Sequence, residues 1–390
     1  MDHVTSKIPQ IPRWPIIGFY ACYFAVIGVW IPYWPLYLSH QGFGAETIGL
    51  LTALMQWIKV PAPPLWGRLA DQGTRHNVVV ITCFAAFVVF NLFFLGSGLV
   101  WVIFVTILYS IFHAGPLALT DGTVMEVCIQ QEWEYGSLRL WGSWGFVLTS
   151  LGVGPLTPLL GMGVVPVIIA LLLFWTALFA MKLPRQVISL ESVAPVPGIF
   201  ARSDVRWFYL SALLMQFSHG AYYGFMSLHL QQHGFSRHAI GLLWALGVVA
   251  EVVLMVYSKS VLLRFGVSRM LTFSILMAAL RWSLIAMTVE LPLLVFAQLL
   301  HAFTFAAFHI AAVRRVHDTA PMHGRGTAQG WLAALSYGVG CGLGMAVSGF
   351  VFARLGHEIM FLVMALAALA GGAASWRAGL LFSRYEGIHV

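Results

Sequence analysis

Long apolar runs, separated by short polar segments, extend along almost the whole chain. A helix that crosses a bilayer needs about 20 predominantly apolar residues, and stretches of roughly that length recur throughout. Six precede a more polar segment at 184–206 and six follow it, near 14–39, 46–66, 77–97, 99–125, 138–160, 162–182, 207–232, 239–262, 268–289, 291–316, 327–354 and 358–381. The pattern predicts an all-α membrane protein of twelve transmembrane helices.

The distribution of basic residues predicts the orientation of these helices. With the amino terminus in the cytoplasm, sixteen of the 21 lysines and arginines fall on the inner side, and only Arg237 and Arg354 fall outside. Short cytoplasmic loops carry an excess of Lys and Arg, so we expect both termini in the cytoplasm. No small-residue cleavage site follows a short apolar core near the start, which favours an uncleaved first span over a signal peptide.

Composition narrows the class of protein further. Sixty per cent of the 390 residues are hydrophobic and 9% are charged, against about 25% charged in soluble domains. The net charge of +7 comes from basic residues between the apolar runs, which does not indicate a nucleic-acid partner. The four cysteines show no paired metal spacing and no disulfide framework. We expect no metal and no cofactor.

The two halves of the chain repeat each other. "HQGFGAETIGLLTAL" (40–54) and "QHGFSRHAIGLLWAL" (232–246) align at an offset of 192 residues, each at the start of the second span of its half. A parallel repeat of six spans places the substrate site near the midplane between the halves. We therefore predict an N-terminal bundle at 1–183, a cytoplasmic linker at 184–206 and a C-terminal bundle at 207–390. The same offset places Lys59 opposite Glu251.

Four candidate site residues lie near the middle of four different spans of the second half. At 1.5 Å per residue, Glu251, Arg281, His301 and His219 lie about 14–19 Å from the outer ends of their spans. Charge inside a span is costly and by default marks a transport pathway or a proton relay. Burial raises and a nearby cation lowers the pKa of a carboxyl group, so substrate binding at Arg281 would change proton binding at Glu251. The alternative is a static Glu–Arg pair that fixes packing.

Further candidates lie in other spans. Asp121 and Arg139 share a depth near the inner side and form either part of the substrate site, an inner gate or a structural clamp. Lys59, near midplane in the second span, is a candidate receptor for a carboxylate.

Three more candidates are uncharged or weakly basic. Tyr222 and Tyr223 follow His219 by three and four residues, so one of them shares its helix face and would suit an aryl acid. His113 lies near midplane in the fourth span. For all three, ordinary packing is the competing interpretation.

Several motifs resemble those of a known superfamily. "GRLADQGTRH" (67–76), between the second and third spans, is similar to the loop signature of the major facilitator superfamily, with Gly67, Asp71 and Arg75 in place and Gly73 one position early. "YGSLRLWGSWGF" (135–146) and "HGAYYGFMSLHLQQHGFSRHAIGLLWALGVVAEV" (219–252) resemble the phenylpropionic acid permease family, which is related to the lactose permease group of proton symporters.

The resemblance implies roles for particular residues. The lactose permease group carries an acid on span eight, an arginine on span nine and a histidine on span ten that couple protons to substrate, which here implies Glu251, Arg281 and His301, with His309 as a competing match. It also implies a substrate-binding role for Arg139. The group's additional acid on span ten has no counterpart between Leu293 and Val313.

The hypothesis that follows is a proton-coupled symporter of a small organic acid, such as a phenylpropionate, that works by alternating access. The chain would act as a monomer in the bacterial cytoplasmic membrane, with its substrate, protons and lipid as partners. Symport of a neutral sugar or nucleoside and proton-driven efflux are the alternatives within transport. A membrane enzyme is disfavoured because no nucleotide loop, nucleophile elbow or histidine–acid metal cluster is present, and a sensor because no soluble output domain is present.

Overall fold

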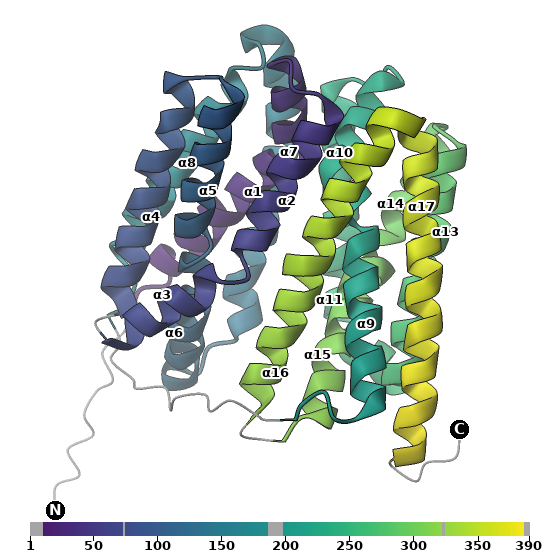
Figure 1. The fold of residues 1–390 in the computed structure, drawn as a ribbon. Helices are drawn as coiled ribbons and strands as arrows, with labels where there is room; N and C mark the ends of the chain where they lie inside the picture. Colours follow the sequence, from purple (N-terminus) through teal and green to yellow (C-terminus); the bar gives the residue numbers. More distant parts are fainter. Residues whose placement is uncertain (1–10, 73–74, 186–197, 322–323, 386–390) are drawn as a thin grey trace, which may run out of the picture.

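The computed structural model describes residues 11–72, 75–185, 198–321 and 324–385, and within these residues every regular element is a helix. The predicted Gly73 and most of the predicted linker, 186–197, lie outside the described residues. The helices of residues 14–180 lie on one side of the molecule and those of residues 203–385 on the other (Figure 1).

The first half contains eight α-helices and a short 3-10 turn. Their bounds are α1 Trp14–His40, α2 Ala45–Ile58, α3 Ala62–Gln72, α4 Arg75–Asn91, η1 Leu92–Leu95, α5 Leu99–His113, α6 Pro116–Gln131, α7 Tyr135–Leu160 and α8 Val164–Ala180. Several predicted spans are interrupted rather than continuous. The span predicted at 46–66 divides into α2 and α3 just before Pro63 and Pro64, and the span predicted at 99–125 divides before Pro116, because proline removes a backbone donor and clashes with the preceding turn.

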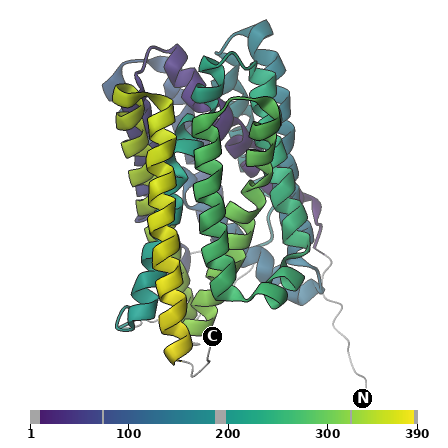
Figure 2. The same ribbon diagram turned by 90° about the vertical axis from the view of Figure 1, so that its right-hand side faces the viewer.

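The second half contains nine α-helices and two π-helical turns. Their bounds are α9 Ser203–Ser218, α10 Gly220–Gln232, α11 Arg237–Val256, α12 Ser258–Phe265, α13 Val267–Met287, α14 Leu291–Leu299, η2 Ala302–Ala307, α15 Phe308–Thr319, α16 Arg325–Leu332, η4 Ala333–Gly340 and α17 Cys341–Tyr385. Inside α17 the backbone breaks at Gly356, with φ 83° and ψ 174°. The second part of α17 then returns alongside the other helices of this half (Figure 2).

Eight helices of the described residues are long and apolar enough to cross a membrane, and one of them, Arg325–Tyr385, contains the break at Gly356. Of the other predicted spans, α8 is a shorter apolar helix of 17 residues, and the spans formed by α2–α3 and α9–α10 are interrupted. The number twelve therefore stays a prediction, as do the domain boundaries and the orientation. We call the end at which α1 begins and α17 finishes the terminal end, and the opposite end the distal end (Figure 1).

The internal repeat is visible in the backbone. Gly42 and Gly234, 192 residues apart in the sequence, both have positive φ, at 89° and 81°. In each turn the next residue, Phe43 or Phe235, donates its backbone N–H to the carbonyl five residues earlier at 3.1 Å. This is the pattern of a Schellman cap, in which glycine takes the left-handed position that a Cβ would disfavour. The repeated sequence motif thus builds the same turn twice at the distal end.

Small residues bring the two halves into close contact. A Cβ on Gly241 of α11 would overlap the Ser150 carbonyl oxygen of α7, and one on Gly49 of α2 would lie 2.9 Å from the Cα of Gly349 in α17. Gly49 and Gly241 occupy equivalent positions of the repeat, so each half uses the same glycine to pack against the other. Small residues allow this approach of helix backbones within a membrane.

Candidate functional site

Arg281 lies at the centre of a buried polar cluster in the second half. Its side chain is fully buried on α13, and its guanidinium carbon lies 4.1 Å from the ring centroid of Tyr222 and 4.8 Å from that of Trp282. The guanidinium donates hydrogen bonds to Gln298 Oε1 at 2.9 Å and to Thr304 Oγ1 at 3.3 Å. All these partners are neutral, and Arg281 makes no ion pair within 4.0 Å in the described part of the chain.

His301 lies between Arg281 and Glu251. Its Nδ1 atom is 3.0 Å from an Arg281 guanidinium nitrogen, and its Nε2 atom is 3.8 Å from Glu251 Oε2. An arginine N–H can only donate, so Nδ1 accepts and the proton of the neutral ring sits on Nε2, facing the carboxylate. Glu251 and Arg281, which the sequence suggested as a direct pair, are thus connected through an imidazole.

His309, the competing candidate, occupies a different place. It lies on α15 beyond the π-helical turn Ala302–Ala307, and its Nδ1 atom is 3.1 Å from the hydroxyl oxygen of Tyr337. Tyr337 itself belongs to the second π-helical turn, Ala333–Gly340. Such turns occur often at functional sites because they displace a side chain from its regular position on the helix.

Gln298 is the principal residue that the sequence analysis missed. Its side chain is fully buried, and its Oε1 atom accepts hydrogen bonds from both Arg281 and the Tyr222 hydroxyl, each at 2.9 Å. Its Nε2 atom has no partner among the described residues. An uncharged amide within an apolar run gives a weak signal, although a fully buried amide requires hydrogen-bond partners as strictly as a charged group does.

An aromatic wall borders the cluster. The ring of Tyr222 lies 4.3 Å from that of Trp244 and 5.6 Å from that of Trp282. The ring of Tyr223 is partly exposed, and its centroid lies 6.5 Å from that of Trp244. Aromatic rings at these separations present faces and edges on which a further ring can stack. Tyr222 belongs to the buried cluster itself, whereas Tyr223 reaches a more open position.

His219 lies at the junction of α9 and α10. It is fully buried, its Nδ1 atom is 2.8 Å from the Met215 carbonyl oxygen, and its ring meets Trp282 edge-on at 5.0 Å. Its Nε2 atom has no partner among the described residues. The predicted histidine therefore contacts the aromatic wall but makes no hydrogen bond to Arg281.

Several of the predicted site residues occupy helix interruptions. Lys59 follows the end of α2, His113 is the last residue of α5, His219 separates α9 from α10, and His301 precedes the π-helical turn. Transporters commonly build their substrate sites from discontinuous helices, whose free backbone groups become available at the site. A functional role for these four residues stays a prediction.

Asp121 and Arg139 form a second polar group in the first half. The Asp121 carboxylate accepts hydrogen bonds from the Tyr20 hydroxyl at 2.6 Å and the Tyr135 hydroxyl at 2.9 Å, while Arg139 Nε lies 4.0 Å away. The guanidinium carbon of Arg139 lies 3.8 Å from the ring centroid of Phe24. Both charged side chains keep about a third of their surface exposed, at 29% for Arg139 and 33% for Asp121.

The Asp121–Arg139 group belongs to the first half and the Glu251–His301–Arg281 chain to the second half. No hydrogen bond or ion pair among the described residues joins the two groups.

Lys59 and His113 lie apart from the Arg281 cluster. Lys59 is exposed and donates to Gln56 Oε1 at 3.2 Å, and its charge acts on His113. The His113 ring is buried between Tyr23, 4.7 Å away at 11°, and Tyr109, 5.0 Å away. The sequence placed both residues near midplane but could not show that they belong to a different group from Arg281.

Arg75 of the loop motif forms an ion pair with another helix of the first half. Gly67 and Asp71 lie on α3, and Arg75 begins α4 and pairs with Glu126 of α6 at 3.0 Å, with both side chains nearly buried at 11% and 12% exposure. This ion pair ties the start of α4 to α6. Asp71 is exposed, and a Cβ on Gly67 would meet no atom within 4 Å.

A separate histidine group lies at the distal end of the second half. His229, His233 and His357 place candidate ligand nitrogens within 4.8 Å of one another. The sequence analysis predicted no metal site and did not select these residues.

Apolar helices long enough to cross a membrane, with charged and aromatic residues buried at helix interruptions, are typical of a multi-pass membrane transporter. Comparison with known proteins agrees. The chain belongs to the MFS_1 like family, whose model matches residues 13–363.

Individual relatives give a range of substrates. The chain is 30% identical to the probable 3-phenylpropionic acid transporter of Escherichia coli (strain K12), over 92% of this chain and 96% of the relative. It is 24% identical to the maltose permease of Geobacillus stearothermophilus, over 90% and 91%. The crystal structure of the nucleoside transporter NupG superimposes with a TM-score of 0.82 at 19% identity, over 94% of this chain and 98% of that one. These relatives are membrane transporters, not enzymes.

Proposed function

We propose that this protein is a proton-coupled symporter of a small aromatic carboxylate, which works as a monomer in the bacterial cytoplasmic membrane. Twelve spans in two bundles, with both termini in the cytoplasm, would alternate access to a site between the bundles. The probable 3-phenylpropionic acid transporter, at 30% identity, supports this substrate class.

The observation that carries the proposal is the unpaired charge of Arg281. Its guanidinium is fully buried, its described partners are neutral, and its Nε atom has no hydrogen-bond partner among the described residues. A buried charge that is not directly paired with an opposite charge is costly. A substrate carboxylate would supply that counter-charge and accept two parallel N–H donors from the planar guanidinium.

The surroundings of Arg281 suit an aryl group attached to the carboxylate. Tyr222 and Trp282 lie beside the guanidinium, and the ring centroids of Trp244 and Trp282 lie 4.3 Å and 5.6 Å from that of Tyr222. Stacked or edge-on contacts with a substrate ring would add about 0.5–1.5 kcal/mol beyond area burial. A carboxylate at Arg281 and a ring against this wall would fix both ends of a short arylalkanoate.

Proton coupling follows from the position of His301. In this proposal Glu251 is ionised when the site is empty, and its negative charge offsets the positive charge of Arg281 through the imidazole between them. A substrate carboxylate at Arg281 makes the site net negative, which favours protonation of Glu251 because a like charge nearby disfavours ionisation. One proton and one carboxylate then enter together, and the site is neutral both empty and loaded.

Alternating access is supported by contacts between the halves. At the distal end, Glu46 of α2 lies 3.5 Å from Arg354 of α17, and the Tyr33 hydroxyl of α1 donates to the Arg237 carbonyl at the start of α11 at 3.4 Å. We assign this arrangement to a state closed on the distal side, which by the predicted orientation is the outer side. Separation of the two halves at these contacts would open the distal side.

A substrate panel tests the proposal. Purified protein in vesicles with an imposed pH gradient, acidic outside, is expected to accumulate 3-phenylpropionate and to alkalinise the medium as substrate enters. Acidification on addition of substrate would show antiport, and accumulation of sugars or nucleosides without any aryl acid would overturn the substrate class.

A neutral sugar or nucleoside is the second candidate substrate. The maltose permease relative covers 90% of the chain, and aromatic faces such as those of Tyr222 and Trp244 also stack on sugar rings and bases. Under this alternative Arg281 would stay paired with Gln298 and Thr304 throughout transport. The panel therefore includes maltose and uridine beside the aryl acids.

A further inference from the structure

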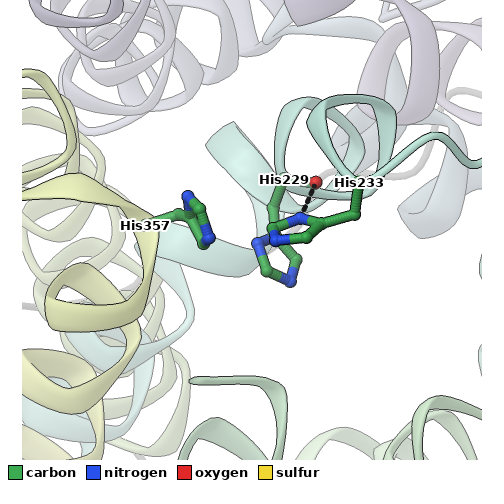
Figure 3. Close-up of side chains that lie close together, drawn as sticks. All are labelled: His229, His233 and His357. Carbon is green, nitrogen blue, oxygen red and sulfur yellow. Dashed lines mark hydrogen bonds between the residues drawn. The ribbon is translucent and has the colours of Figure 1, made fainter. Parts of the chain in front are cut away.

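Three histidines from two distant parts of the chain meet at the distal end of the second half. His229 lies in the last turn of α10, His233 directly follows α10, and His357 follows the backbone break at Gly356 inside α17 (Figure 3). The ring centroids are 4.6–4.7 Å apart in all three pairs. The three imidazoles therefore surround one small space.

The hydrogen bonds of these rings leave nitrogen lone pairs available at that point. His233 Nδ1 lies 2.8 Å from the His229 carbonyl oxygen, so Nδ1 carries the proton and the ring lone pair lies on Nε2 (Figure 3). His229 is 1% exposed, and neither of its ring nitrogens has a partner among the described residues; the same holds for His357 Nε2. Buried polar atoms are normally satisfied, so this group requires a partner that the side chains themselves do not supply.

The space between the rings can hold an ion. A cavity of about 90 Å³ is lined by the three histidines, by Glu358 and by residues 286–289, at the end of α13 and just beyond it. Histidine nitrogens bind Zn²⁺ at about 2.0–2.1 Å in a tetrahedron, which places ligand atoms about 3.3 Å apart. In the structure the ligand nitrogens lie within 4.8 Å of one another. Small rotations of the rings would bring them to the distance that a tetrahedral ion requires.

We propose that His229, His233 and His357 form a binding site for a divalent transition-metal ion of the Zn²⁺ class. Three neutral imidazoles suit zinc, copper and nickel rather than the oxygen-preferring Mg²⁺ or Ca²⁺. The fourth position is taken by water or by the exposed carboxylate of Glu358, which also offsets part of the ion's charge. The hydrogen bond from His233 to a backbone carbonyl is the usual outer contact that orients a metal-binding imidazole.

The position of the site gives the ion a structural consequence. It joins the distal end of α10 to the break between the two parts of α17, next to the connection that follows α13. An ion bound here ties three segments of the second half together. Because α10 begins at His219, beside the aromatic wall, bound metal would stiffen the helix that leads from the transport site to the distal end.

Metal binding is measured on the full-length protein, purified without a histidine tag and stripped of metal. Co²⁺ alone is the first probe, because its tetrahedral complexes have a visible ligand-field absorption, and Zn²⁺ is then used to displace it. We expect one equivalent of Co²⁺ to bind and one equivalent of Zn²⁺ to abolish the absorption. Absence of that absorption, together with no change in unfolding temperature on addition of Zn²⁺, would overturn the proposal.

Three variants locate the site. His357→Gln and His233→Gln each remove one ligand from a partly exposed position, and each is expected to weaken Zn²⁺ binding at least tenfold. His238→Gln is the matched control, because His238 is exposed near the distal end outside the group, and it is expected to bind like the unaltered protein. Equal affinity in all three variants would show that the ion binds elsewhere and would overturn the assignment. Neither measurement involves transport, so the result is independent of the proposed function.

Discussion

The carboxylate of Glu251 lies 3.8 Å from Nε2 of His301, whose other ring nitrogen, Nδ1, contacts the guanidinium of Arg281. An acid that would be costly alone within a span is thereby linked to a buried cation without pairing with it directly. The imidazole can pass on a change at either end, because one nitrogen accepts while the other carries a proton. Substitutions at these three residues should therefore change transport in different ways.

Replacing Glu251 by Gln removes the proton acceptor and retains the shape of the side chain. We expect concentrative uptake driven by a pH gradient to fall to background while exchange of labelled for unlabelled substrate continues, since exchange needs no net proton movement. Glu290→Gln is the control, because Glu290 is exposed in the connection before α14. Unimpaired accumulation by the Glu251 variant would exclude this residue as the coupling site.

The two candidate histidines are expected to behave differently. His301→Gln breaks the connection between Arg281 and Glu251 and should reduce coupled uptake about 10²-fold or more, the range that proton-transfer groups commonly contribute. His309→Gln should have a smaller effect, because His309 contacts Tyr337 rather than Arg281. Measurement of uptake rate against pH for both variants distinguishes them, and a larger loss in the His309 variant would reverse the assignment.

Substitution of Arg281 tests the carboxylate site itself. Arg281→Gln removes charge-assisted hydrogen bonds worth about 1.5–3 kcal/mol, so substrate affinity is expected to fall about tenfold to a hundredfold. Arg281→Lys should recover little of this, since lysine lacks the planar pair of donors. Arg269→Gln, on the same helix at an exposed position, serves as the control in equilibrium binding measurements. Undiminished binding of aryl acids by Arg281→Gln would show that the substrate carboxylate does not bind at Arg281.

A methyl group at Gly241 should disfavour the arrangement closed at the distal end. It would overlap the Ser150 carbonyl and the Tyr33 hydroxyl, at a cost of about 1–3 kcal/mol. The readout is labelling of a cysteine at Thr52, which faces Gly224 between the halves, by an impermeant maleimide in a background without native cysteines. Gly241→Ala should increase the labelling rate from the distal side.

Gly152→Ala is the matched control for that measurement. Gly152 lies on the contacting helix α7, and a Cβ there would meet no atom within 4 Å. It should leave labelling unchanged and raise stability by up to about 1 kcal/mol through helix propensity. Equal labelling of Thr52→Cys in both variants would show that the Gly241 contact does not hold the distal end closed.

The proposed metal site should lose affinity in acid. Imidazole must be neutral to bind a metal ion, and its ordinary pKa is about 6.5, so protons compete with the ion below that pH. We expect the stabilisation by Zn²⁺, about 2.7 kcal/mol at a hundred times the Kd, to be present at pH 7.5 and to disappear by pH 5. Thermal unfolding with and without Zn²⁺ at several pH values measures it, and stabilisation that persists at pH 5 would point to carboxylate ligands instead.

Much of the candidate site could be selected from the sequence because a membrane makes polar residues conspicuous. Glu251, Arg281 and His301 interrupt apolar runs at similar depth, and the structure places them in one chain of contacts. The repeat at 192 residues likewise anticipated equivalent turns at Gly42 and Gly234. Gln298 and Tyr337 escaped selection because neutral polar and aromatic residues occur in many spans without function.

The histidine group shows where selection by spacing alone fails. His229 and His233 are four residues apart, a spacing that places two ligands on one helix face, and this signal was available. His357 lies more than a hundred residues away, and nothing in its local sequence links it to the other two. The break at Gly356 and the packing of α17 against α10 bring it there.

The sequence by itself determined the apolar helices, the repeat and the position of each buried charge along its helix, because these depend on composition and on a fixed rise per residue along a helix. The tertiary structure alone decided which charges meet, since contact depends on the rotation of each helix about its axis and on the distance to its neighbours. The rotation of the helices about their axes places His301 rather than Arg281 beside Glu251. The non-helical backbone at Gly356 places His357 beside His229 and His233. Those contacts are set by packing between helices, to which residues throughout the chain contribute.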